Sequence, residues 1–299
     1  MFVFRELKIC VPLNRIDQSE TCGRHFDRLT WTFMNSPFAS PDPLDDAERG
    51  LRQDEFFFLL QPKFALRGIR LAGFECLMRW HHPARGILEP ASFISLIEDS
   101  CLATRFTDLL TRRAAHLLAQ WKAAGRGELS LAINLSPSEL GHPDFPAQLS
   151  ALLTSLALEP ARVEIELTDV VPPARLDWLV EAIHATQAIG VRVALDDFGA
   201  GFNSLTLLQQ LPVDIVKFDR SLIRDVLQNS ESMRVVETLV HIAQGHGKHI
   251  VMTGIETAEQ FEWAGTLPDV DGQGFYLGEP LHEAAVATFI TDYHARIPS

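Results

Sequence analysis

The chain has 299 residues, 46% of them hydrophobic, which is enough to bury one large barrel or two ordinary domains and excludes a disordered chain. Its formal charge of −13 argues against duplex nucleic acid as a partner. No apolar run approaches the roughly 20 residues that cross a bilayer, and charged residues follow the opening MFVF. We therefore expect a cytoplasmic protein with no membrane insertion, whose four sparse cysteines are reduced.

Residues 1 to about 44 differ from the rest of the chain. They show no hydrophobic period and end in the turn-rich run SPFASPDPLDD. We expect an N-terminal extension or linker of unknown role over residues 1–44 and a single domain over residues 45–299. Trp31, Phe33 and Phe38 in the extension are candidates for docking on the domain or on a protein partner.

Beyond residue 44, short strand-like runs alternate with longer amphipathic runs, a pattern typical of a parallel sheet with crossover helices. The predicted helices follow Leu102, Pro173 and Ser230, and the first two end at Gly125 and Gly190. Eight strands over roughly 250 residues favour an α/β fold of the (β/α)8 barrel type, with a doubly wound sheet as the alternative. The predicted strands are 55–61, 72–79, 129–135, 163–168, 191–196, 214–219, 249–254 and 272–277.

The alternation of side chains along these strands predicts a polar interior. In strand 163–168, for example, Val163, Ile165 and Leu167 share one face and Glu164 and Glu166 the other. Large apolar residues belong against the helices, so the polar face points into the barrel. Its members cluster near the carboxyl ends of the strands, where barrel enzymes hold their active sites. The residues expected to meet there are Glu75, Asn134, Glu166, Asp196, Asp197 and Lys217.

Several carboxylates in one place need a positive charge between them, and oxygen ligands of this kind select Mg²⁺, Mn²⁺ or Ca²⁺ over zinc or copper. Each residue also has a structural alternative. A lone inward Glu or Lys is often half of a buried ion pair. Arg79 is either part of a salt bridge or a fork for phosphate, and Asp197 is a candidate helix N-cap. The letters DFG at 197–199 do not indicate a kinase, because the chain lacks the glycine-rich loop and the HRD motif.

Over residues 47–280 the chain resembles the EAL domain, the module of bacterial cyclic di-GMP phosphodiesterases. The shared motifs occur in the order of the family, and ECLMRW stands where the family has EALLRW. In chain order they are LLQP (59–62), ECLMRW (75–80), AINLS (132–136), ELTD (166–169), ALDDFGAGFNSL (194–205), LPVDIVKFDRSLI (211–223), GIET (254–257) and QGFYLGEP (273–280).

This resemblance implies a barrel whose first strand is antiparallel to the others, and metal-dependent hydrolysis of cyclic di-GMP to linear pGpG. It also implies Mg²⁺ or Mn²⁺ as the cofactor, Ca²⁺ as an inhibitor, and a possible homodimer. By motif it assigns metal ligation to Glu75, Asn134, Glu166, Asp196 and Asp197, catalytic roles to Lys217, Glu256 and Asp197, and ligand contacts to Gln61, Arg79 and Gln273.

The departure with the largest consequence is Thr253. The family reads AEGVET where this chain reads MTGIET, and the first Glu of that motif is expected near the attacking water. A neutral hydroxyl replaces neither an anionic ligand nor a proton acceptor, and losing a catalytic carboxylate commonly costs about 10²–10⁴ in rate. Asp169 in place of the usual Glu, and Ala200, Phe202 and Asn203 in the following loop, are lesser departures.

The first hypothesis is therefore a domain that binds cyclic di-GMP with divalent metal and hydrolyses it weakly or not at all. The second is an active phosphodiesterase in which Glu256, or Asp197 with a water, takes over the role of the glutamate that Thr253 replaces. A protein-interaction scaffold that has lost its nucleotide is the third. An enolase-like barrel with Lys217 as the base fits the inward residues but leaves the motifs at 194–205 and 273–280 unexplained.

Overall fold

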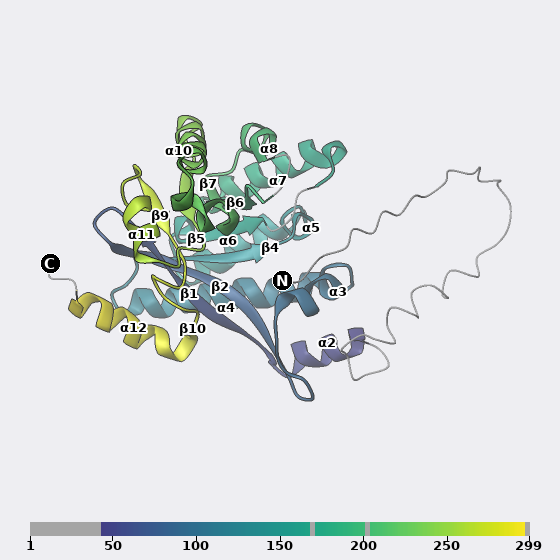
Figure 1. Ribbon diagram of the computed structural model, residues 1–299. Helices are drawn as coiled ribbons and strands as arrows, with labels where there is room; N and C mark the ends of the chain where they lie inside the picture. Colours follow the sequence, from purple (N-terminus) through teal and green to yellow (C-terminus); the bar gives the residue numbers. More distant parts are fainter. Residues whose placement is uncertain (1–42, 168–170, 201–203, 297–299) are drawn as a thin grey trace. The chain divides into compact units, whose positions relative to one another are not determined.

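The computed structural model describes residues 43–167, 171–200 and 204–296 (Figure 1). Within these residues, eight strands follow one another around a closed barrel, because β1 pairs with both β2 and β9. The barrel strands are β1 (Phe56–Ala65), β2 (Arg70–His82), β4 (Ser130–Leu135), β5 (Val163–Leu167), β6 (Arg192–Phe198), β7 (Ile215–Phe218), β8 (His249–Met252) and β9 (Val270–Gly272).

The predicted fold class is confirmed, including its unusual first strand. β1 is antiparallel to both of its barrel neighbours, while every other neighbouring pair from β2 to β9 is parallel. β1 and β2 form a long hairpin, in which Gln61 lies opposite Glu75 and Phe57 opposite Arg79. The short strands β3 (Gly86–Leu88) and β10 (Leu281–His282) extend the sheet beside β2 and β1.

Helices cover the outside of the barrel and alternate with the strands (Figure 1). The glycines predicted to end two of them, Gly125 and Gly190, follow α4 and α7 with φ of +75° and +87°, in the left-handed region that glycine adopts without a steric penalty. The helices are α2 (Pro43–Arg52), α3 (Ile94–Glu98), α4 (Ala103–Ala123), α5 (Pro137–Leu140), α6 (Phe145–Ser155), α7 (Leu176–Ala188), α8 (Ser204–Gln210), α9 (Arg220–Arg224), α10 (Ser230–Gly245), α11 (Ala258–Ala264) and α12 (Glu283–Arg296).

The apolar core lies between the strands and these helices. Phe56, Trp80, Phe93 and Phe106 are fully buried there, and the Phe56 ring lies 5.0 to 5.5 Å from the other three. This packing buries the outward faces of β1 and β2 against the helices. The opposite, inward faces carry Gln61, Lys63 and Glu75, together with the apolar Leu59 and Leu77.

The last predicted strand differs from the structure, and the predicted N-terminal extension is described only in part. The predicted strand over 272–277 is wrong, because β9 ends at Gly272 and the chain then turns, with the amides of Leu277 and Gly278 donating to the Gly274 carbonyl. A Cβ at Gly274 would lie 2.2 Å from the Ile255 carbonyl oxygen, so this turn passes against the neighbouring loop more closely than a side chain allows. Most of the predicted extension, with Trp31, Phe33 and Phe38, lies outside the described residues. Its last two residues begin α2.

No helix in the described ranges is long and apolar enough to cross a membrane.

Candidate metal and nucleotide site

Three carboxylates from three strands meet inside the barrel, toward the carboxyl ends of the parallel strands. Glu75 comes from β2, Glu166 from β5 and Asp196 from β6, each on the inward face of its strand. One oxygen of each lies within 4.8 Å of an oxygen of the others. We call these residues, with Lys217, the mouth cluster.

Lys217 of β7 holds the mouth cluster together. Its Nζ donates to Glu166 at 2.6 Å, to Glu75 at 3.1 Å and to Asp196 at 3.2 Å, and the residue is only 2% exposed. Burial disfavours its charge, but the three carboxylates outweigh burial and raise the pKa of Lys217 well above its usual value. Lys217 is therefore a fixed ammonium ion whose donors are already used.

The carboxylates of the mouth cluster are not equivalent. Burial opposes ionisation of Glu75, but the Lys217 charge and three hydrogen bonds prevail and lower its pKa to about 2. Burial, together with the Glu75 charge, raises the pKa of Glu166 well above its usual value despite Lys217. Burial likewise raises the pKa of Asp196, with Lys217 opposing. When all are ionised, three carboxylates against one ammonium leave two excess negative charges.

Amide side chains fix Glu75 from two sides. The Asn134 Nδ2 donates to Glu75 Oε1 at 3.1 Å, and the Gln273 Nε2 donates to Glu75 Oε2 at 2.8 Å and to Gln61 Oε1 at 3.0 Å. Gln273 is 3% exposed, and its Oε1 is buried without a hydrogen-bond partner. An unsatisfied buried acceptor beside a cluster of carboxylates is a place where a bound cation or ligand donor would fit.

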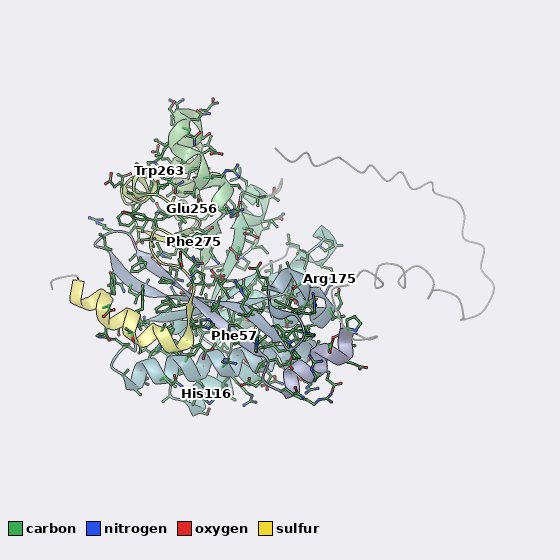
Figure 2. All side chains as sticks on the ribbon, turned by 60° about the horizontal axis from the view of Figure 1, so that its bottom comes forward. Phe57, His116, Arg175, Glu256, Trp263 and Phe275 are labelled. Carbon is green, nitrogen blue, oxygen red and sulfur yellow. The ribbon has the colours of Figure 1, made fainter. Side chains whose placement is uncertain are left out.

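A cavity of about 370 Å³ opens above the mouth cluster. Glu256 and Phe275 lie near each other on its rim (Figure 2). Besides Glu75, Asp196 and Lys217, the cavity is lined by Gln61, Asp197, Asp219, Arg220, Thr253, Gly254, Glu256, Gln273, Gly274 and Phe275.

Asp197, Glu256 and Thr253 therefore share one cavity with the mouth cluster. Asp197 has φ of +51°, and burial and the Asp196 charge raise its pKa. Glu256 is exposed and precedes Thr257, the N-cap of α11. The Thr253 hydroxyl donates to the Phe218 carbonyl at 2.9 Å, so its proton is engaged by the backbone at the end of β7.

Arg79 lies apart from this cavity. It is four residues beyond Glu75 on β2, and its guanidinium donates to the carbonyl of its neighbour Met78 at 2.8 Å. It is not among the residues that line the cavity, and it forms no salt bridge within the described residues, so its predicted contact with the ligand stays a prediction. Among the described hydrogen bonds, Asn134 contacts the mouth cluster through its bond to Glu75.

A second buried cluster, which we call the floor cluster, lies at the opposite end of the barrel. Glu164 of β5 accepts from Lys63 of β1 and from Arg192 of β6. Burial opposes ionisation of Glu164, but the two cations lower its pKa to about 2. The alternation placed Glu164 on the inward face. Lys63 was missed because the predicted strand 55–61 ended two residues before it, whereas β1 continues to Ala65.

Sequence reasoning also missed two residues that line the cavity, Arg220 and Phe275. Arg220 follows Asp219 at the start of α9, and Phe275 belongs to the turn after β9. The position of Arg220, three residues after Lys217 at the end of a strand, is the signal that could have found it. Phe275 was assigned to a strand that the structure does not contain.

A model of the EAL domain family matches residues 44–280 of this chain. The chain belongs to the EAL domain family.

The relatives and solved structures agree with this assignment. The EAL chain is 29% identical to the cyclic di-GMP phosphodiesterase NbdA of Pseudomonas aeruginosa, over 93% of this chain and 36% of NbdA. It aligns with the structure of the PaMucR phosphodiesterase in complex with c-di-GMP at a TM-score of 0.74 and 28% identity, over 82% of this chain and 99% of that one. An EAL domain protein from Listeria monocytogenes aligns at a TM-score of 0.72 and 26% identity, over 85% and 99%. The chain spans about a third of the length of the curated relatives it matches.

Proposed function

We propose that this EAL domain binds cyclic di-GMP together with Mg²⁺ or Mn²⁺ in the cavity above the mouth cluster, and that its hydrolysis to pGpG is weak or lost. The observation that carries the proposal is the unbalanced mouth cluster, in which three buried carboxylates face one ammonium. NbdA and PaMucR, which bear the name phosphodiesterase, support cyclic di-GMP as the nucleotide.

The donor set fits a hard divalent cation. Glu75, Glu166 and Asp196 offer carboxylate oxygens close together, and the amide oxygen of Asn134 is available because its nitrogen makes the bond to Glu75. Asp197, on the rim, is the candidate ligand of a second ion. When bound, divalent ions lower the pKa of a coordinated water and stabilise charge on phosphodiester oxygens.

The protein's own residues supply position and charge. Lys217 holds the three carboxylates in place. Gln273, which lines the cavity, donates to Glu75 and has a buried Oε1 without a hydrogen-bond partner. In hydrolysis, the water oxygen bonds to phosphorus, the bond from phosphorus to the 3′ oxygen breaks, and the leaving oxygen takes up a proton. The step therefore needs a group that accepts the proton of the attacking water.

Thr253 is the reason to expect slow turnover. By the resemblance, it stands where the family has a glutamate, and its hydroxyl is neutral and already donates to Phe218. It cannot take up a proton as a carboxylate does. Without that base we expect a rate about 10²–10⁴ lower than in an enzyme that has it.

An active phosphodiesterase is the second candidate. The observation in its favour is that Asp197 and Glu256 line the same cavity as Thr253, so two other carboxylates are within the site. Burial and the Asp196 charge raise the pKa of Asp197, which suits a proton acceptor better than an ordinary surface aspartate.

The test is pGpG release by the full chain with Mg²⁺ and with Mn²⁺, in the wild type, Thr253→Glu and Thr253→Gln. We expect weak turnover in the wild type, a gain of at least tenfold in Thr253→Glu, and no gain in Thr253→Gln, which matches the size of Glu without its charge. Rapid wild-type turnover that Thr253→Glu leaves unchanged would establish the second candidate. Absence of nucleotide binding with either metal would favour the protein-interaction scaffold.

A further inference from the structure

The cavity above the mouth cluster is strongly acidic for a site proposed to take an anionic nucleotide. Two of its lining residues are cations, Lys217 and Arg220. Lys217 is buried and donates to three carboxylates, so it has little to offer an incoming phosphate. Arg220 is exposed. The carboxylates that line the same cavity are Glu75, Asp196, Asp197, Asp219 and Glu256.

The Arg220 guanidinium is free to bind a ligand. Within the described residues it makes no hydrogen bond or ion pair. Its neighbour Asp219 does not neutralise it, because the Asp219 Oδ1 caps α9 by accepting from the Ser221 amide at 2.9 Å. Arg224, on the same short helix, differs: it pairs with Asp225 at 3.1 Å and does not line the cavity.

Local packing holds the base of Arg220 against the wall of the cavity. A Cβ placed on Gly254 would lie 2.3 Å from the Arg220 Cβ, and Gly254 has φ of +73°. A glycine at 254 therefore lets the loop that carries Thr253 and Glu256 pass directly beside Arg220. The backbone and Cβ of Arg220 are therefore packed against the loop on the same rim of the cavity as Thr253 and Glu256.

The chemistry of the nucleotide indicates what Arg220 meets. A cyclic dinucleotide carries two phosphodiester groups, each with one negative charge. The group that is cleaved must lie at the mouth cluster, which leaves the second without a partner there. A planar guanidinium with paired N–H donors matches two phosphate oxygens, and such charged bonds are stronger than neutral ones.

We propose that Arg220 binds the second phosphodiester of the nucleotide, the one that is not cleaved, through paired hydrogen bonds from its guanidinium. This inference rests on the proposed function and extends it, because it assigns the recognition of a cyclic dinucleotide to a residue outside the metal cluster.

The test measures the affinity of the full chain for cyclic di-GMP by calorimetry, with Ca²⁺ present to limit turnover, at several salt concentrations. The variants are Arg220→Gln and Arg220→Lys, with Arg224→Gln as the control that removes the same charge from the same helix. We expect Arg220→Gln to weaken binding about 10- to 100-fold. Arg220→Lys should weaken it less, because lysine keeps the positive charge but lacks the paired N–H donors of the guanidinium. Arg224→Gln should stay within about twofold of the wild type.

Salt dependence separates a phosphate contact from a contact to the base. Affinity in Arg220→Gln should depend less on salt than in the wild type, since a screened charge pair has been removed. Equal affinity in Arg220→Gln and wild type, or an equal loss in Arg224→Gln, would overturn the proposal. A loss with unchanged salt dependence would assign Arg220 to a guanine edge and also overturn it. If the wild type itself binds no nucleotide, the proposed function fails rather than this inference alone.

Discussion

The barrel buries charges at both of its ends, and the two clusters differ in the balance of acid and base. The floor cluster sets one carboxylate, Glu164, against Lys63 and Arg192. The mouth cluster sets Glu75, Glu166 and Asp196 against Lys217 alone. Both are largely removed from water, where an unpaired charge is costly.

We interpret the difference as one between a structural cluster and a candidate metal site. In the floor cluster, burial of Glu164 is offset within the chain, and its pKa of about 2 shows that the charged form is favoured. In the mouth cluster the pKa of Glu75 is also lowered to about 2, but burial and mutual repulsion raise the pKa of Glu166 and of Asp196. A charge deficit that the fold leaves in place beside a cavity is what a cation-binding site requires.

The largest expected effect is on the floor cluster. Glu164→Gln leaves the buried Lys63 and the partly exposed Arg192 without their carboxylate, so we expect a loss of about 3–5 kcal/mol in the free energy of unfolding. Chemical denaturation with and without Mg²⁺ measures it, and the loss should not depend on the metal. Glu159→Gln, which removes a carboxylate from an exposed pair with Arg162, is the control and should cost less than about 1 kcal/mol. Equal losses in the two variants would remove the distinction between buried and exposed pairs.

The mouth cluster should respond to metal instead. We expect divalent metal to raise the melting temperature of the wild type, because an ion that binds only the folded state stabilises it by about 2.7 kcal/mol at 100 times its Kd. Glu166→Gln removes a central carboxylate and should abolish most of this rise. Thermal unfolding in EDTA, Mg²⁺ and Mn²⁺ follows the effect. A rise that persists in Glu166→Gln would place the metal elsewhere.

A buried carboxylate at a third place, Glu139, sharpens the comparison because it has no cation within the described contacts. Glu139 accepts hydrogen bonds from the Thr107 hydroxyl and from Ser136, and burial raises its pKa despite them. Because the pKa of Glu139 is higher in the folded protein than in the unfolded chain, the free energy of unfolding falls as the pH rises through the folded-state pKa. Glu139→Gln, which keeps the capping box of α5, should therefore stabilise the fold above that value by about 1 kcal/mol or less.

The measurement for Glu139 is the melting temperature of both proteins from pH 5 to pH 8. The advantage of the Gln variant should shrink as pH falls, because Glu139 then becomes neutral in the wild type as well. An advantage that is constant across this range would mean that ionisation of Glu139 does not control it.

An effect of similar size concerns Cys76, which follows Glu75 but faces the other side of β2. It is buried with the outer face of the barrel, and burial raises the pKa of its thiol. Cys76→Ala should cost about 1 kcal/mol in stability and leave cyclic di-GMP affinity unchanged. A weaker affinity in this variant would show that the outer packing of β2 controls the position of Glu75.

The sequence was sufficient for the barrel and for the inward face of each parallel strand. It could not assign Glu164 and Glu166 to different clusters, because both lie on the inward face of the same strand, two residues apart. The level that a residue reaches inside a barrel depends on the stagger between strands, which alternation does not contain. Lys63 was missed for a different reason, because the predicted strand ended at Gln61 and β1 continues to Ala65.

The rim was predicted less well than the cluster below it. Motif order identified Thr253 and Glu256, but the closeness of Arg220 to them follows from the contact with Gly254 between two separate loops. Arg79 was placed on the inward face by the alternation along its strand, and its predicted contact with the ligand stays a prediction. Its guanidinium donates to the carbonyl of its neighbour Met78.

Calorimetric titration of cyclic di-GMP into the wild-type chain, in Mg²⁺ and again in EDTA, tests the role of the mouth cluster most directly. If its excess negative charge is balanced by a divalent ion that carries the nucleotide, binding is expected in Mg²⁺ and should be at least tenfold weaker in EDTA. Equal affinity in the two buffers would contradict a metal-dependent site, and no binding in either would contradict the nucleotide itself.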